Sequence, residues 1–350
     1  MGARAMPSHK LFNVAMCVLV FSAAGCNTER PRIDVSNVAL PEGFEVLNWM
    51  DVVHAVPRDN NQAKNWSHFH DADPAFWALW SEAILQAGPA EDTATANVVL
   101  AFMRDMKPML DAIDTTSGSA DVLAREEARL MDAFKRFHVL DPNHPLPRVV
   151  WMPSGFNVAV YPTDELLAVG LDWFLGTSHP LHDELPPSLF PAYRLARMRP
   201  ELLATSAFRG WVLVRHQSLL GPSPRTAEQL LFWGQCMDVV AQCFPDDAPW
   251  TLIDWTAEEW AWAVANERAI WAELQPQDVM FASAPRDVMR WFQEGPFTRA
   301  GALPQSCPDR LGVFVGWRML DAYREAHPDL SHAALMQLSD PLAVMRHYRP

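Results

Sequence analysis

The chain has 350 residues, of which 49% are hydrophobic and 20% charged, a balance typical of a folded globular protein and not of a disordered or fibrous one. Its formal net charge is −14, and removing residues 1–25, which hold Arg4 and Lys10 and no acid, leaves −16. Because so acidic a surface repels phosphate groups, the charge argues against a nucleic-acid partner and against membrane attachment through a basic patch.

The first 25 residues predict a signal peptide. Arg4 and Lys10 precede an apolar stretch from Leu11 to Ala24 that only two polar residues interrupt. At about 14 residues this stretch is shorter than the roughly 20 that a transmembrane helix needs. We therefore expect residues 1–25 to be removed on export.

The signal peptide ends in Ala23-Ala24-Gly25-Cys26, small residues followed by a thiol, as at the cleavage site of a bacterial lipoprotein. We expect lipid on Cys26, where each buried methylene group would contribute about 0.8 kcal/mol to anchoring. Asn27 is not the Asp that retains lipoproteins in the inner membrane, so the outer membrane is favoured. The alternative is an ordinary cleavage that releases a soluble periplasmic protein.

Residues 26–40 are polar and predict a tether, followed by one domain over residues 41–350. We expect a mainly helical fold with a small antiparallel β-sheet (α+β): a helical lobe over 41–147, a β meander over 148–176 and helices over 177–350. In the first lobe Asp73 can cap a helix that has Pro74 at its first position. Its apolar stripe would comprise Phe76, Trp77, Trp80, Ile84 and Leu85.

The meander is predicted from three short apolar runs, residues 149–151, 156–161 and 166–171, which are separated by turns containing Pro153 and Pro162. Three cysteines besides Cys26 remain after export. Cys236 and Cys243 would stand about 10.5 Å apart on one helix, too far for a disulfide. We therefore expect Cys236, Cys243 and Cys307 to be buried free thiols.

A capping box at residues 256–259 predicts a helix with Trp260, Ala263, Val264, Ile270 and Trp271 on its inner face. Glu267 falls on that same face. A buried carboxylate needs donors, and we expect Arg318 or backbone amides to supply them, unless the acid stays protonated. Glu267 is thus a candidate functional acid, with a purely structural role as the alternative.

Two histidine-rich segments, residues 68–73 and 179–184, contain potential metal ligands. His68 and His70 could share one face of an extended segment, while His179 and His182 lie in a proline-rich loop. No His is followed by Glu, so the helical zinc-protease motif is missing, as are nucleophile-elbow and phosphate-loop motifs. We expect no metal, no cofactor and no catalytic residue.

Short blocks follow one another along the chain at residues 32–36, 170–176, 190–194, 230–235, 262–271, 295–298 and 312–317. In these ordered blocks the sequence resembles the gliding-motility lipoprotein family GldB. The later blocks contain Asn266, Trp271, Gly316 and Trp317, an interaction or core motif. The family is also distantly similar to zincin-like peptidases, which implies a degenerate zincin-like core without the histidine pair.

The resemblance implies a lipid-anchored, non-catalytic protein that faces the periplasm and binds components of the gliding and type IX secretion machinery. Two other classes stay open. One is a divergent zincin-like metallohydrolase that uses His68, His70, His179 and His182, or a hydrolase that uses Glu267. The other is a soluble periplasmic ligand-binding protein.

Overall fold

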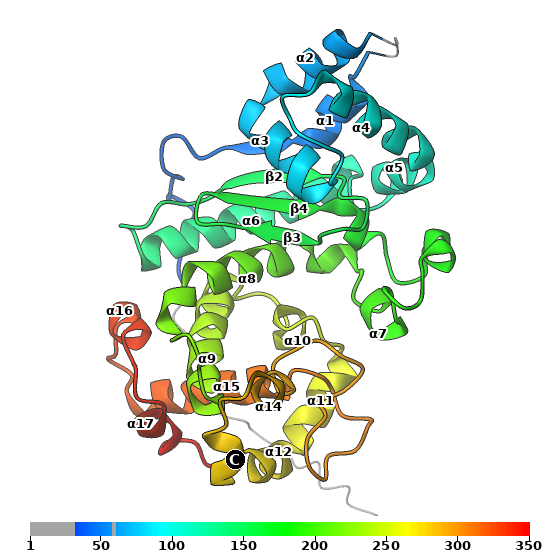
Figure 1. Ribbon diagram of the computed structural model, residues 1–350. Coiled ribbons are helices and arrows are strands. Elements are labelled where there is room, and N and C mark those ends of the chain that lie inside the picture. Colours follow the sequence, from blue (N-terminus) through cyan, green and yellow to red (C-terminus); the bar gives the residue numbers. More distant parts are fainter. Residues whose placement is uncertain (1–31, 58–60) are drawn as a thin grey trace, which may run out of the picture.

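The computed structural model describes residues 32–57 and 61–350, arranged as a sheet between two groups of helices (Figure 1). The predicted signal peptide, Cys26 and the start of the tether lie outside the described residues. The prediction of a mainly helical chain with one small sheet is confirmed. Among the described residues, no helix is long and apolar enough to cross a membrane.

The helices of the first lobe begin at well-defined caps. Asn61 accepts a hydrogen bond from the Lys64 amide, and Asp73 accepts one from the Phe76 amide with Pro74 next to it, as predicted. The elements are α1 Trp49–His54, α2 Gln62–Ala72, α3 Pro74–Ala78, the π-helical turn η1 Leu79–Ile84, α4 Thr93–Asp105, α5 Lys107–Thr115 and α6 Ala120–Leu140.

The sheet has four strands in the order β1-β2-β4-β3, where the sequence predicted a three-stranded meander. Its members are β1 Val46–Asn48, β2 Arg148–Met152, β3 Val160–Pro162 and β4 Leu166–Gly170. β1 and β4 both pair parallel with β2, and only β3 is antiparallel to its neighbour. The predicted antiparallel topology is therefore wrong. After β2 the chain skips the neighbouring position in the sheet, forms β3 at the edge and then turns back to form β4 between β2 and β3.

The turn that follows β2 and carries the chain past the position of β4 is held by Asp172, which follows β4. Its carboxylate accepts hydrogen bonds from the Ser154 amide at 2.6 Å, the Ser154 hydroxyl at 2.8 Å and the Phe156 amide at 2.6 Å. These bonds hold Gly155 and Phe156 at φ of 66° and 58°, the left-handed region. Burial raises the pKa of Asp172, which these three donors partly counteract.

Helices cover both faces of the sheet: α1–α5 lie on one side, and α6 and α8 (Leu203–Arg215) on the other (Figure 1). On the first side the Trp80 indole donates to the Pro153 carbonyl oxygen at 2.8 Å. On the second, the Trp151 indole donates to Glu127 of α6, also at 2.8 Å. Residues 149–152 are buried, as in a parallel sheet covered on two sides.

The second half is mainly helical, as predicted, although residues 290–310 form a long connection without a helix. Its core is the pair α9 Thr226–Cys243 and α15 Leu311–Ala326, which cross where Gly234 meets Gly316. The other elements are α7 Ala192–Leu195, α8 Leu203–Arg215, α10 Pro249–Leu252, α11 Ala257–Ala265, α12 Glu267–Leu274, α13 Gln277–Met280, α14 Pro285–Met289, α16 His332–Met336, α17 Pro341–Met345 and the 3-10 turns η2 Leu171–Phe174, η3 Pro180–Glu184, η4 Pro200–Leu202 and η5 Gln217–Leu219.

Candidate functional site

Glu267 lies at a break between two helices. The capping box at Thr256 opens α11 as predicted, but α11 ends at Ala265, and Asn266 leaves the helical conformation with ψ of 11°. The Asn266 side chain donates to the Trp262 carbonyl oxygen at 2.8 Å and so closes α11. Val264 lies within α11, two residues before the break, and is 45% exposed, so the prediction that it faces inward is wrong.

Glu267 begins α12 and is only 9% exposed. Its Oε1 accepts two hydrogen bonds, from Arg318 Nε at 3.1 Å and from the Tyr348 hydroxyl at 2.8 Å. The predicted burial of Glu267 and the predicted pairing with Arg318 are confirmed. Burial and the neighbouring carboxylate raise the pKa of Tyr348, so the phenol stays protonated and donates.

The other candidate residues of the motif have packing contacts. Trp271 meets the Tyr348 ring edge to face at 5.0 Å between centroids, and Trp317 packs against Trp260 at 5.5 Å. Gly316 lies so close to α9 that a Cβ there would stand 2.3 Å from the Leu230 carbonyl oxygen. Together these contacts hold α12, α15 and the residues after α17 to one another.

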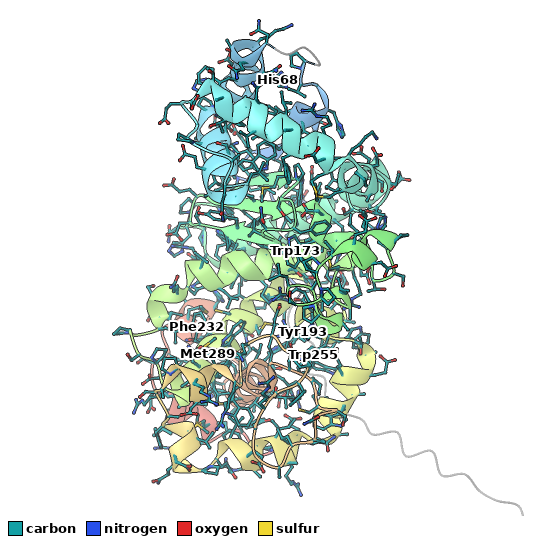
Figure 2. All side chains as sticks on the ribbon, turned by 45° about the vertical axis from the view of Figure 1, so that its right-hand side comes forward. His68, Trp173, Tyr193, Phe232, Trp255 and Met289 are labelled. Atoms are coloured by element: carbon teal, nitrogen blue, oxygen red, sulfur yellow. The ribbon has the colours of Figure 1, made fainter. Side chains whose placement is uncertain are left out.

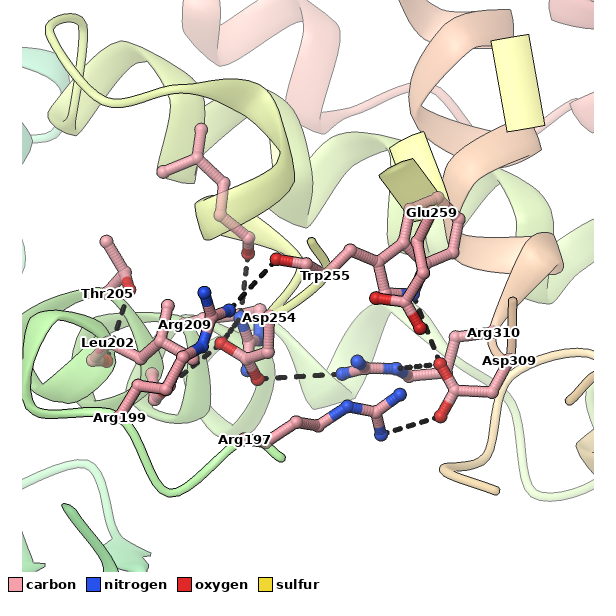
Figure 3. Close-up of polar contacts among 12 residues, drawn as sticks. Arg197, Arg199, Leu202, Thr205, Arg209, Asp254, Trp255, Glu259, Asp309 and Arg310 are labelled. Atoms are coloured by element: carbon pink, nitrogen blue, oxygen red, sulfur yellow. Dashed lines mark hydrogen bonds and ion pairs between the residues drawn. The ribbon is translucent and has the colours of Figure 1, made fainter. Parts of the chain in front are cut away.

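A second charged cluster, which sequence reasoning missed, comprises Arg197, Arg209, Asp254, Asp309 and Arg310 (Figure 3). Both nitrogens at the end of Arg209 donate to Asp254. Arg310 lies between the two acids, with 3.6 Å from Nη1 to Asp254 Oδ2 and 3.1 Å from Nε to Asp309 Oδ1. Arg197 Nη1 lies 2.7 Å from Asp309 Oδ2. We call these five residues the arginine cluster.

Four of the five residues of the arginine cluster are buried, Arg197 is partly buried, and the acids are ionised. Burial by itself would raise the pKa of Asp254, but the guanidinium groups of Arg209 and Arg310 bring it down to about 2. Arg310 and Arg197 likewise lower the pKa of Asp309 against the effect of burial. Asp309 accepts two further bonds, from the Trp255 indole at 3.1 Å and the Gly295 amide at 2.9 Å.

Two members of the arginine cluster have strained backbones. Asp254 has φ of 55° and Arg310 has φ of 51°, in the left-handed region that costs an ordinary residue about 1–2 kcal/mol. Such strain persists only where the surroundings hold it in place. The ion pair between these two residues joins both strained turns, so the cluster clamps the loops before α11 and α15 together.

The two histidine segments lie apart. Residues 68–72 belong to α2, so the extended arrangement considered for His68 and His70 is wrong: Asn61 caps a helix there. His68 Nε2 lies 2.7 Å from the Val52 carbonyl oxygen, and His70 stacks on Trp66. Figure 2 places His68 at the far end of the first lobe, away from Trp173, which precedes the second segment.

In the second segment His179 precedes η3, and His182 is 7% exposed with its ring 6.2 Å from that of His179. Burial lowers the pKa of His182. Across residues 32–57 and 61–350, no three His, Cys, Asp or Glu side chains are grouped as metal ligands would be. The four histidines of the metallohydrolase alternative are therefore not brought together.

The chemistry of both clusters is that of fixed charges. Glu267 and Asp254 each accept from an arginine, and an acid with a pKa of about 2 has no proton to donate near neutral pH. Sequence spacing pointed to Glu267 because it interrupts an apolar helix face. It could not point to Asp254, whose partner Arg209 is 45 residues away.

One protein family accounts for almost the whole chain. The sequence model described as the gliding motility protein GldB matches residues 28–350, a range that begins just after Cys26 and includes both charged clusters. No curated protein and no solved structure matches the chain significantly. The chain therefore belongs to the GldB family of gliding motility lipoproteins.

Proposed function

We propose that this protein is anchored by lipid on Cys26 to a membrane facing the periplasm, and that it binds protein components of the gliding and type IX secretion machinery without catalysing a reaction. The observation that carries the proposal is the family match over residues 28–350, which starts two residues after the cysteine of a lipoprotein cleavage site. Family membership makes the protein a gliding-related lipoprotein; the anchored residue, the partners and the lack of catalysis are our proposals.

The charged clusters support a binding role over a catalytic one. Catalytic acids and bases need a pKa near the working pH and access to a substrate. Glu267 is instead bonded to Arg318 and Tyr348, and Asp254 to Arg209 and Arg310. Both acids are thus committed to holding the helices of the second half in place, which suits a rigid platform for partners.

The anchor is tested with Cys26→Ser. We expect the unaltered protein in the membrane fraction with acyl chains on its N-terminal peptide by mass spectrometry. Cys26→Ser should appear unacylated in the soluble periplasmic fraction. The matched control is Cys17→Ser, which alters a thiol of the discarded signal peptide and should leave membrane attachment unchanged. Unaltered protein that is unacylated and released by osmotic shock would contradict the proposal.

The binding role is tested by cross-linking in intact cells, solubilisation and identification of the captured proteins. We expect motility and secretion components to be recovered with the unaltered protein and lost with Cys26→Ser, because the soluble form is no longer held beside them. Metal analysis of the same purified protein tests the metallohydrolase alternative. Stoichiometric zinc that disappears in His182→Ala would overturn the non-catalytic proposal.

A further inference from the structure

The first described residues run along the middle of the molecule. Arg32 forms an ion pair with Asp246, which follows α9, and Val35 is 8% exposed. The Val38 amide donates to the Val35 carbonyl oxygen at 3.1 Å, which closes a turn over the buried side chain. The last part of the predicted tether therefore lies against the body of the protein, and only the residues before it can span a gap.

The surface beside Arg32 is a line of paired charges. Asp247, next to Asp246, accepts from Arg129 Nη2 of α6 at 2.7 Å. Arg129 also pairs with Glu126, whose side chain is buried beneath this surface and accepts from Arg125 Nε at 3.0 Å. We call the whole set the tether strip: Arg32, Arg125, Glu126, Arg129, Asp246 and Asp247.

We infer that the tether strip is the face that the protein turns toward the bilayer. This inference rests on the proposed lipid at Cys26. Only six residues lead from Cys26 to Arg32, so an extended chain reaches at most about 22 Å. A globule of this size is about 50 Å across. The lipid thus holds the side on which Arg32 lies near the headgroups and keeps the opposite side away.

The position of the strip decides how the molecule lies. α6 runs through the middle of the molecule, between the lobe of α1–α5 and the helices around α12 (Figure 1). An anchor attached at the middle of the molecule brings one of its long sides to the membrane. The two ends of the molecule then lie on either side of the anchor point. α2 and α12 would then both be free to meet partners in the periplasm.

The charge of the strip suits a lipid surface. Its three arginines and three acids cancel, so the net charge of −16 after Gly25 is carried entirely by the remaining residues. Anionic headgroups repel the residues that carry this negative charge, whereas they exert no net repulsion on the neutral strip. The strip consists of charged residues alone, so it would rest above the headgroups and not insert.

The inference is tested with fluorescent labels on the acylated full-length protein in vesicles of phosphatidylethanolamine, phosphatidylglycerol and a rhodamine-labelled lipid. Three exposed alanines on helices are replaced singly by cysteine: Ala128 on α6 beside the strip, Ala63 on α2 and Ala272 on α12. Because Cys236, Cys243 and Cys307 are buried, a maleimide dye reacts with the new thiol. We expect energy transfer to the labelled lipid to be several-fold stronger from Ala128→Cys than from the other two.

The outcomes separate this inference from the proposed function. An N-terminal peptide without acyl chains would defeat the anchor itself. An acylated protein whose dye at Ala63→Cys or Ala272→Cys transfers as strongly as that at Ala128→Cys would overturn only the orientation. Ten Gly and Ser residues inserted after Asn27 should weaken transfer from Ala128→Cys, since a longer tether no longer holds the strip close. Unchanged transfer would contradict the role given to tether length.

Discussion

A buried carboxylate loses several kcal/mol of hydration unless hydrogen-bond donors replace the lost water. Glu267 receives two, from Arg318 and from Tyr348, two residues before the last described residue. The tyrosine serves as both a donor and a ring for Trp271 to pack against. Glu267 is thus the point at which the end of the chain is tied to α12 and α15.

Tyr348→Phe removes only the donor, since the ring contact with Trp271 remains. We expect the free energy of unfolding to fall by about 1.5–3 kcal/mol, the range for a hydrogen bond to a charged group. Chemical denaturation monitored by tryptophan fluorescence measures the change. Tyr161→Phe, at a half-buried tyrosine of β3, is the matched control and should cost less than about 0.5 kcal/mol. Equal losses in both variants would show that the bond to Glu267 contributes nothing.

His216, at the end of α8, predicts a pH dependence. Burial, followed by the nearby His332 and Arg215, lowers its pKa from 6.5 to about 4. Between these two values the unfolded chain binds a proton that the folded protein does not. Stability therefore falls as the pH falls from 6.5 to 4, by up to about 3 kcal/mol from this group.

The His216 contribution is isolated by comparing unfolding free energies of the unaltered protein and His216→Gln from pH 7 to pH 4. The difference between them should shrink or change sign toward pH 4, because Gln cannot bind the proton. His347→Gln, at an exposed position, should keep the pH profile of the unaltered protein. Parallel profiles for the unaltered protein and His216→Gln would refute the assignment.

At the scale of residues, the sequence could predict the burial of Glu267 and its pairing with Arg318, because helical spacing places this acid on an apolar helix face. It could not predict the arginine cluster. Asp254, Asp309 and Arg310 lie in connections between helices, where no periodicity applies. Asp254 and Arg310 have left-handed backbones, and the two acids pair with Arg197 and Arg209 from a distant part of the chain.

At the scale of elements, apolar runs predicted β2, β3 and β4 but not their directions. A run of buried residues fits a parallel or an antiparallel strand equally well. The direction is decided by the turn around Asp172, whose acceptor role emerges only when Ser154 and Phe156 fold onto it. β1 has only three residues, too few to give a pattern.

The crossing of α9 and α15 depends on two glycines. Gly234 and Gly316 let the helix backbones approach so closely that a Cβ at Gly234 would stand 2.4 Å from the Gly316 carbonyl oxygen. Gly316→Ala must push the two helices apart, because its new methyl group meets backbone and not a flexible side chain. We expect a loss of about 1–3 kcal/mol or more, from overpacking.

Thermal unfolding followed by circular dichroism measures the effect of Gly316→Ala. The matched control is Gly221→Ala, where a Cβ would meet nothing within 4 Å. That control should leave the melting temperature nearly unchanged or raise it slightly, since alanine restricts the unfolded chain. A Gly316→Ala protein as stable as the Gly221→Ala protein would show that the helices can separate at no cost.

At the scale of the whole molecule, the arginine cluster joins parts that are far apart in sequence. Arg197 precedes η4, Arg209 belongs to α8 against the sheet, and Arg310 directly precedes α15 in the core of the second half. The cluster therefore links the sheet layer to the C-terminal helices. The sequence predicted the helical character of both parts, but not this connection between them.

Asp254→Asn tests the link. Asparagine tolerates the left-handed backbone, so the substitution changes mainly the charge and leaves Arg209 and Arg310 without their shared acid. We expect a loss of about 3–5 kcal/mol, as when one partner of a buried pair is removed. Denaturation should measure it, with the exposed Asp329→Asn as control. Loss below about 1 kcal/mol would mean that the cluster does not clamp the two loops.

The three free thiols set a condition on how the protein matures. Cys236, Cys243 and Cys307 are buried, and burial raises the pKa of each, so in the finished fold they are poor nucleophiles. The proposed export would bring the chain to oxidising enzymes while these thiols are still exposed. Correct maturation therefore requires the core to close before these thiols form wrong disulfides. Slower folding should raise the yield of wrongly cross-linked protein.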